Sequence, residues 1–112
     1  MNIGVEEKSG TTVVFVLDGK LDLNASKPLK DAVERMFPVK KNVVLHLGKV
    51  DFANSSGLGL LVSLLKSAKS YSVNLYICEL QSYVKELFEV TQLNRIFEIY
   101  ETIEDVMLKC EG

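Results

Sequence analysis

The sequence is poor in cysteine, has a single histidine and contains no long apolar run. Cys78 and Cys110 lack the C-x-x-C spacing of redox or zinc motifs, so we expect two reduced packing residues rather than a disulfide. No apolar segment approaches the roughly 18 residues of a membrane span. The first ten residues are too polar and acidic for a signal peptide, so the expected compartment is the cytoplasm.

The charge balance narrows the choice of partners. Thirteen Lys and Arg residues against fifteen Asp and Glu residues give a net charge of −2. Nucleic acids and anionic membranes attract basic surfaces, so we expect neither as the main partner. A length of 112 residues, 47% of them hydrophobic and 25% charged, is typical of one soluble globular domain, here spanning residues 1–112.

The motifs of the common enzyme and cofactor classes are missing. A serine hydrolase needs G-x-S-x-G and a histidine base, whereas Ser55 follows Ala53-Asn54 and His46 lies inside an apolar segment. A Walker A sequence is absent, and no group of histidines, cysteines and carboxylates has metal-ligand spacing. The sequence therefore predicts neither an enzyme nor a bound cofactor or metal.

Apolar periodicity predicts strands that alternate with helices after an initial hairpin. Strands are expected at 4–8, 11–17, 43–47, 74–78 and 96–100, and helices at 25–37, 57–71, 83–90 and 102–109. The segment 19–24 is expected to be an extended loop. This order predicts an α/β fold, with a single-layer mixed sheet of four to five strands and about four helices packed mainly on one face.

The stretch 51–71 organises the chain, because an apolar strand gives way there to an amphipathic helix. A helical face is indicated by the spacing of Leu58, Leu61, Val62, Leu65 and Ala68. Asn54, Ser55 and Ser56 precede it, and these residue types are preferred at helix N-caps. We therefore expect two hydroxyls and an amide at the positive end of a helix dipole, where negative charge is stabilised.

Leu60 and Leu64 widen the apolar face of this helix to an arc of about 200°, well beyond the usual core stripe. Two interpretations explain the extra width. Both leucines are buried between the sheet and neighbouring helices, or they form an exposed ridge that docks a partner. Periodicity alone does not decide between them.

Three segments resemble those of a known family. Residues 52–59, FANSSGLG, resemble the D-S-S/T-G-L-G signature of the bacterial anti-sigma factor antagonists, which are STAS domains. Residues 19–22, GKLD, resemble the family's G-x-L-D segment at the expected distance upstream. The LYIC strand and the following VKELFEVTQLNRIFEIYET resemble its third helix and last strand. The resemblance covers nearly the whole chain and implies a STAS-like fold.

The resemblance implies a protein switch. In that family the antagonist binds an anti-sigma factor that is also a serine protein kinase, and so frees a sigma factor. The kinase phosphorylates the first serine of the signature, Ser55 here, with Ser56 as the competing acceptor, and a serine phosphatase removes the phosphate. The residues assigned to partner binding on this basis are Asp22, Asn54, Ser56, Gly57, Leu58, Gly59, Leu60 and Leu64.

The chain departs from the family pattern at two places. Asn54 stands where the family has an aspartate, which keeps the helix cap but removes a charge that kinase recognition or phosphate stability can depend on. Ala25-Ser26 stands where the family has Thr-Ala. Two alternatives therefore stay open. One is a STAS scaffold or lipid-transporter accessory subunit without phosphorylation, and the other is a small module that binds phosphate or nucleotide at the helix N-terminus.

Overall fold

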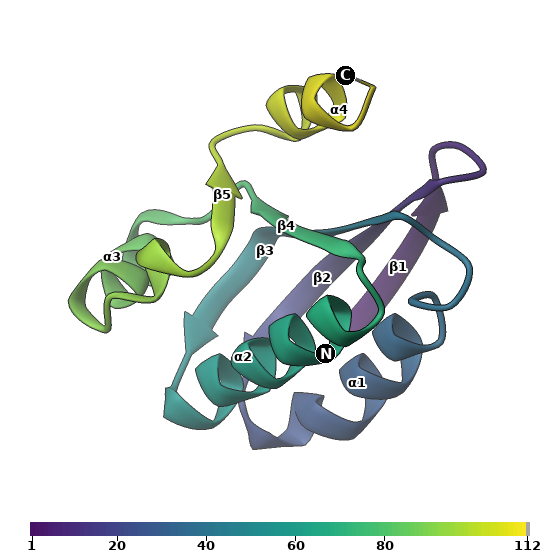
Figure 1. Cartoon of the computed structure of the whole chain (residues 1–112). Helices are drawn as coiled ribbons and strands as arrows, with labels where there is room; N and C mark the ends of the chain where they lie inside the picture. The colour runs from purple at the N-terminus through teal and green to yellow at the C-terminus, as the bar shows by residue number, and fades with distance from the viewer. Residues whose placement is uncertain (112) are drawn as a thin grey trace.

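Strand β2 joins an antiparallel hairpin to a parallel sheet. The computed structural model describes residues 1–111, and within them the strand order is β1-β2-β3-β4-β5, with only the β1–β2 pair antiparallel (Figure 1). The strands are β1 (Asn2–Glu7), β2 (Thr12–Leu21), β3 (Asn42–Ala53), β4 (Asn74–Cys78) and β5 (Glu98–Tyr100). The helices are α1 (Ser26–Glu34), α2 (Ser55–Ser70), α3 (Ser82–Val90) and α4 (Ile103–Glu111), with 3-10 turns η1 (Leu23–Ala25) and η2 (Leu93–Arg95). The predicted α/β fold with a mixed sheet is confirmed.

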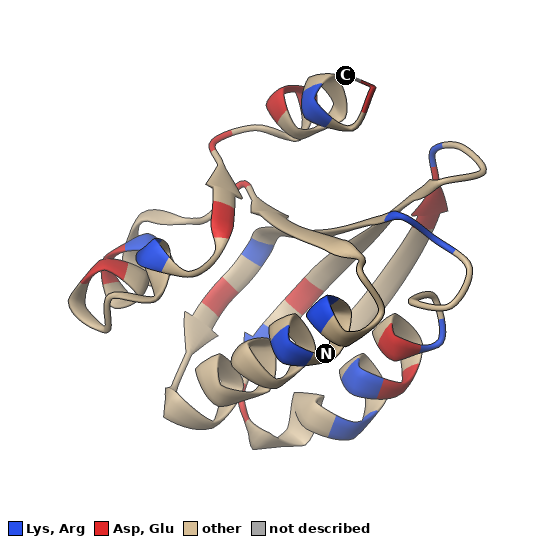
Figure 2. Ribbon diagram, viewed as in Figure 1, with Lys and Arg blue, Asp and Glu red and all other residues tan. Residues whose placement is uncertain are grey.

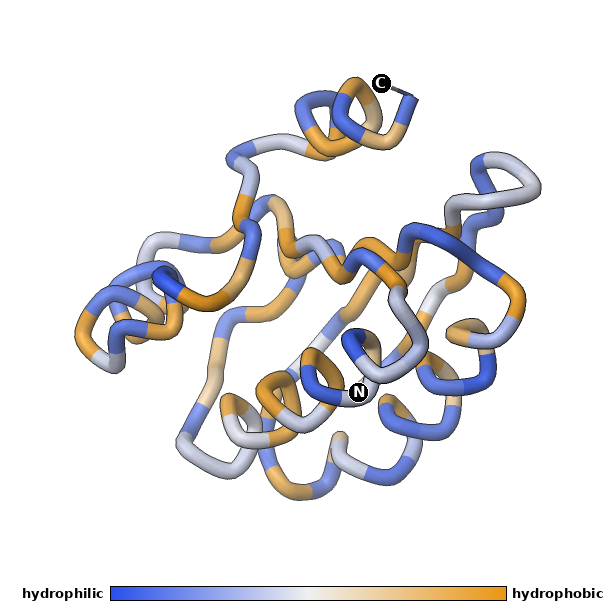
Figure 3. The backbone as a smooth tube through the Cα atoms, in the orientation of Figure 1, coloured by the Kyte–Doolittle hydropathy of each residue, from blue (hydrophilic) through white to orange (hydrophobic). Residues whose placement is uncertain are grey.

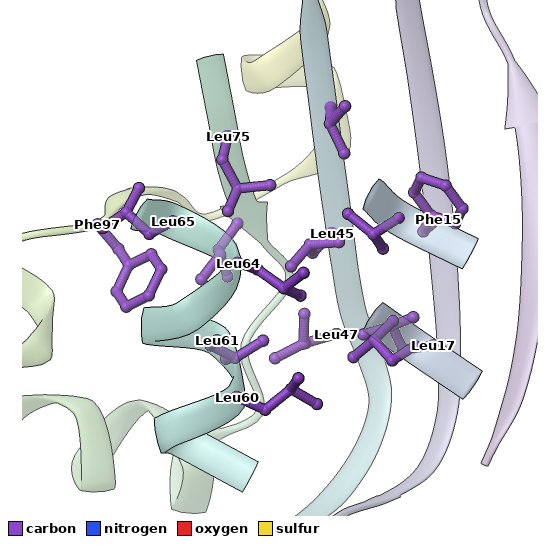
Figure 4. Packing of buried hydrophobic residues seen from close by; sticks show 14 of the residues in the cluster. Phe15, Leu17, Leu45, Leu47, Leu60, Leu61, Leu64, Leu65, Leu75 and Phe97 are labelled. Atoms are coloured by element: carbon purple, nitrogen blue, oxygen red, sulfur yellow. The ribbon is translucent and has the colours of Figure 1, made fainter. Parts of the chain in front are cut away.

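Helices cover both faces of the sheet, but unequally. The main core lies between the sheet and α1, α2 and α3. Figure 4 shows its centre, where Leu45 and Leu47 of β3 meet Leu61 and Leu64 of α2. Along the chain, Figure 3 shows hydrophobic and hydrophilic residues alternating through α2, as in a helix that buries one side. Among the helices of residues 1–111, α4 is the one that packs on the opposite face of the sheet, which agrees with the prediction of helices mainly on one face.

Strand β3 is longer than the sequence predicts. It was expected to end at Leu47, but it continues to Ala53. In this second half the buried residues are Leu47, Val50 and Ala53, spaced by three rather than two. An alternating pattern is the usual signature of a half-buried strand, so the sequence of this half does not look like one.

Two register shifts against β2 cause this spacing. The pairs Val16–His46 and Asp18–Lys49 enclose one extra residue in β3, and so do the pairs Gly19–Val50 and Lys20–Phe52. Each shift is a β-bulge, which leaves one residue unpaired and turns the following side chains. The segment 19–24 is corrected for the same reason, because residues 19–21 continue β2 beside bulged β3 and are not a loop.

Leu60 and Leu64 lie in the core and do not form an exposed ridge. Their side chains are 6% and 0% exposed, so the assignment of these two residues to partner binding is wrong. Helix α2 lies across the sheet and contacts α1 at its side, so the arc that must be apolar is wider than that of a helix packed on one surface.

Helix α4 is anchored from a neighbouring strand. Glu79, which follows β4, accepts a hydrogen bond at Oε2 from the backbone N–H of Ile103 at 2.8 Å. At the same helix end, Thr102 Oγ1 accepts a hydrogen bond from the N–H of Asp105 at 3.1 Å. Two side chains, one of them charged, therefore satisfy the first free N–H groups of α4.

The two cysteines and the histidine are packing residues. Cys78 and Cys110 are free thiols in the cluster beneath α4, as predicted. Burial, with a smaller contribution from Glu79, raises the pKa of the Cys78 thiol to about 12. His46 Nδ1 accepts a hydrogen bond from the N–H of Gly48 at 3.2 Å, so its partner is local. Within residues 1–111, no helix is long and apolar enough to span a membrane.

Candidate functional site at the amino end of helix α2

The ends of β2 and β3 bring two capping residues side by side. Leu21 pairs with Ala53 at the carboxyl ends of these parallel strands. Asp22 follows Leu21 and its Oδ1 accepts a hydrogen bond from the N–H of Asn24 at 3.0 Å, which starts η1. Asn54 follows Ala53 and starts α2. Two helical segments, η1 and α2, therefore begin next to each other at the carboxyl ends of β2 and β3.

Asn54 is the N-cap of α2. Its backbone is extended, with φ −132° and ψ −178°, and its Oδ1 accepts a hydrogen bond from the N–H of Gly57 at 3.1 Å. Its carbonyl accepts the first helical bond from Leu58 N–H at 2.9 Å. Ser55 and Ser56 are thus the first two helical residues, and both are exposed. The expected cluster of an amide and two hydroxyls at the positive end of a helix is confirmed.

Gly57 places the first turn of α2 directly on the end of β2. A Cβ atom at Gly57 would lie 1.8 Å from the carbonyl oxygen of Leu21 and 2.4 Å from its carbonyl carbon. The same carbonyl oxygen accepts a hydrogen bond from Asn54 N–H at 3.3 Å. Only glycine permits this approach of helix to strand, so the position of Ser55 is fixed by backbone packing.

The family model of the STAS domain matches residues 2–106. The chain belongs to the STAS domain family. Among its relatives is a protein of Listeria monocytogenes named anti-sigma-B factor antagonist, which is 33% identical over 103 residues. That alignment covers 88% of this STAS domain chain and 90% of the relative.

Solved structures share the fold of this STAS domain. An anti-sigma factor antagonist from Mycobacterium paratuberculosis superposes with a TM-score of 0.87 at 20% identity, covering 99% of this chain and 94% of that one. The Bacillus cell fate determinant SpoIIAA in its phosphorylated form superposes with a TM-score of 0.75 at 17% identity, covering 97% and 99%. The relatives are regulatory binding proteins by name, in agreement with the prediction of a non-enzyme.

The accessible part of the site in this STAS domain is smaller than the predicted set. Asn54, Ser55, Ser56 and Gly59 are exposed, and Asp22 is half-buried. Gly57 and Leu58 are buried, so they cannot contact a partner and instead hold the first turn in place, which corrects their assignment. At Gly59 an added Cβ would meet no atom within 4 Å, so packing within the chain does not require this glycine.

The first turn of α2 contains no acidic residue of its own. The carboxylate that the structure places at this end of the strands is that of Asp22, which caps η1. The nearby cation Lys20 lies over the ring of Phe52, 5.9 Å from the ring centroid. Within residues 1–111, no three His, Cys, Asp or Glu side chains are grouped to hold a metal. The site can therefore accept a covalently attached anion, but it has no built metal centre.

Two exposed apolar residues near the site were missed by the sequence reasoning. Leu23, next to Asp22 in η1, is 72% exposed, and Phe52, next to Ala53 in β3, is 37% exposed. The available signal was their position, since each immediately adjoins a predicted site segment. They add exposed apolar surface next to Asp22 and Ala53 along the chain.

Proposed function

We propose that this STAS domain is an anti-sigma factor antagonist that is switched off by phosphorylation of Ser55. The partner is an anti-sigma factor with serine kinase activity, and a serine phosphatase restores the active form. The names of the relatives support the antagonist function, and the phosphorylated form of SpoIIAA supports the modification. The observation that carries the proposal is that Ser55 is exposed at the start of α2 while Asn54 serves as the cap.

A phosphate on Ser55 leaves the fold intact. It adds about −1.5 to −2 charges at neutral pH. At a helix N-terminus this charge is favourable by roughly 0.3–1 kcal/mol. Because Asn54 makes the capping hydrogen bond and Gly57 makes the contact with β2, neither depends on the Ser55 hydroxyl. The modified domain should therefore have the same structure as the unmodified one.

The partner is then the molecule that senses the phosphate. A dianion that enters a docked surface without a matching cation must lose its hydration, which costs several kcal/mol. A loss of about 3–4 kcal/mol weakens binding by two to three orders of magnitude. An on/off switch therefore follows from the local charge alone, without a conformational change.

The experiment compares variants at Ser55 with a matched change at Ser56. The anti-sigma factor is captured from a lysate of the source organism with the full chain as bait, then purified for calorimetry. We expect Ser55→Ala to bind with the affinity of the unmodified chain and Ser55→Asp to bind about a hundredfold to a thousandfold more weakly. After incubation of the chain with the partner and ATP, mass spectrometry should locate the phosphate on Ser55, also in Ser56→Ala.

Two results would contradict the proposal. Equal partner affinities of Ser55→Ala and Ser55→Asp would show that negative charge at this position does not control binding. A phosphate on Ser56 would show that the modified residue is the second serine. Thermal unfolding of both Ser55 variants serves as the control, since both should melt close to the unmodified chain.

One observation favours a second candidate, a STAS scaffold without phosphorylation. Asn54 lacks the charge of the aspartate that precedes the serine in the family signature, while it keeps the cap. If the captured partner binds the chain but transfers no phosphate, and Asn54→Asp introduces the transfer, the scaffold is the better description.

A further inference from the structure

A cleft of about 630 Å³ opens between α3, η2 and β5, and no residue of α2 lines it. Its floor includes the half-buried apolar residues Leu80 and Ile99 beside the buried rings of Phe88 and Phe97, whereas its rim carries Lys85 and two glutamates, Glu89 and Glu101. This volume lies within the roughly 300–1,000 Å³ of sites that bind ligands. An apolar floor with a charged rim suits a partner group that is apolar at its centre and polar at its ends.

One wall of the cleft is a strand with an open edge. Within the described sheet, β5 pairs only with β4, so the backbone groups along its other side have no strand partner. Ile99 pairs with Ile77 and points to the same face, but Ile77 is fully buried and Ile99 is half-buried. The helices therefore cover β4 and leave β5 partly open. An extended peptide can pair with such an edge and place alternate side chains in the adjoining cleft.

The surroundings of the cleft are acidic. Residues 82–101 contain four glutamates and two cations, so this segment carries a formal charge equal to the −2 of the whole chain. Figure 2 shows red on both α3 and β5. Within the described part of the chain, the ion pair across the cleft joins Lys85 to Glu101 at 3.9 Å between two exposed side chains. A pair of this kind contributes little, so it does not cancel the attraction for an incoming cation.

We propose that the cleft between α3 and β5 binds an extended peptide of a partner protein, and that this peptide carries an apolar residue with lysine or arginine two positions to either side. The peptide backbone adds a strand to β5. The apolar side chain lies on Leu80 and Ile99, and the basic side chains reach Glu89 and Glu101. This site is separate from Ser55, so it offers the domain a second, independent contact.

The test is a titration of the full, isotopically labelled chain with the blocked peptide Thr-Lys-Thr-Leu-Thr-Lys-Thr, followed by amide NMR. Lys, Leu and Lys share one side of this peptide when it is extended. We expect saturable shifts at residues 98–101 and along α3. The same peptide with Glu in place of both Lys residues should bind about tenfold more weakly at low salt. Shifts centred on β1, equal binding of the Glu peptide, or no saturable shift at millimolar peptide would each overturn the proposal.

Charge-reversed variants complete the test. We expect the double change Glu89→Lys and Glu101→Lys to weaken binding of the Lys peptide about tenfold, with the folded spectrum retained because both side chains are exposed. The matched control reverses two exposed carboxylates away from the cleft, Glu6→Lys on β1 and Asp31→Lys on α1, so that the net charge changes by the same amount; it should leave the affinity unchanged. Equal loss in this control would show attraction by net charge only and would overturn the assignment of the cleft.

Discussion

The amino ends of α2 and α4 both have free backbone N–H groups, and different kinds of side chain accept hydrogen bonds from them. Both helices follow a strand of the sheet and both begin near an exposed or half-buried hydroxyl residue. At α4 the hydroxyl of Thr102 accepts a backbone hydrogen bond, and the carboxylate of Glu79 accepts another. At α2 the amide side chain of Asn54 does the capping and both serine hydroxyls are left out of it.

The difference lies in the charge that each helix end already holds. The amino end of α4 has Glu79 against it and Glu104 and Asp105 in its first turn. The first turn of α2 has no acidic residue. Because fewer acidic residues in the first turn leave more of the partial positive charge of the helix available, we expect an added anion to be more favourable at α2 than at α4. The molecule thus contains one helix whose first turn carries acidic residues and one whose first turn carries none.

The largest effect is expected at the backbone contact that α2 has and α4 lacks. In Gly57→Ala the new Cβ would lie 1.8 Å from the Leu21 carbonyl oxygen, a backbone atom that cannot rotate away. The first turn of α2 must lift from β2, and we expect a loss of about 3 kcal/mol or more in the free energy of unfolding. Urea denaturation measures the loss.

Gly59→Ala is the matched control for this prediction. Its Cβ meets nothing within 4 Å, and alanine is favoured over glycine in a helix by roughly 0.5–1 kcal/mol. This variant should be slightly more stable than the parent chain. If Gly57→Ala and Gly59→Ala were equally stable, the contact between α2 and β2 would not hold the first turn.

An intermediate effect is expected at the carboxylate that holds α4. Glu79→Ala removes the acceptor of the Ile103 N–H, and loss of a hydrogen bond to a charged group costs about 2 kcal/mol. Glu86→Ala, an exposed change on α3, is the control and should be close to neutral.

Alkylation of Cys78 can show whether Glu79→Ala destabilises the region of α4, because this thiol lies in the cluster beneath α4. Its pKa of about 12 keeps the native thiol protonated and unreactive at pH 8. In a Cys110→Ser background, Glu79→Ala should speed alkylation of Cys78 and Gly57→Ala should affect it only through global unfolding. Unchanged labelling in Glu79→Ala would mean that the carboxylate does not hold α4 down.

The smallest effect is expected at the cap of α2. Asn54→Ala removes the bond to Gly57 N–H and should cost about 1 kcal/mol. Asn54→Asp keeps an acceptor and adds a charge that the free helix end favours, so its stability should match or exceed that of the parent. Thermal melts at low and high salt separate the two contributions. If Asn54→Ala were neutral, one of the two serines would be able to replace the cap.

The sequence predicted the features that depend on neighbours along the chain. The cap at Asn54, the helix that follows and the strand 74–78 come from local propensity and periodicity, and all three appear in the structure. The same holds for the order of strands and helices, which specified the fold class.

Features that depend on a partner element were not predictable in this way. The buried position of Leu64 depends on α1 lying beside α2, and the need for glycine at 57 depends on a carbonyl of β2. The anchor of α4 joins Glu79 to Ile103 across an intervening helix and strand. The second half of β3 was missed because its bulges replace the alternating pattern with a spacing of three.

Those bulges also limit how the chain length can vary. Each bulge turns the side chains of β3 that follow it. The number of residues from Leu47 to Ala53 therefore determines the orientation of Asn54 at the start of α2. A single deletion there would turn Asn54 away from its capping position and carry Ser55 to another side of the molecule. Insertions at the β1–β2 turn would leave this edge unchanged. The position of Ser55 therefore depends on the number of residues in the bulged half of β3, and we expect a change in that number to disturb the start of α2.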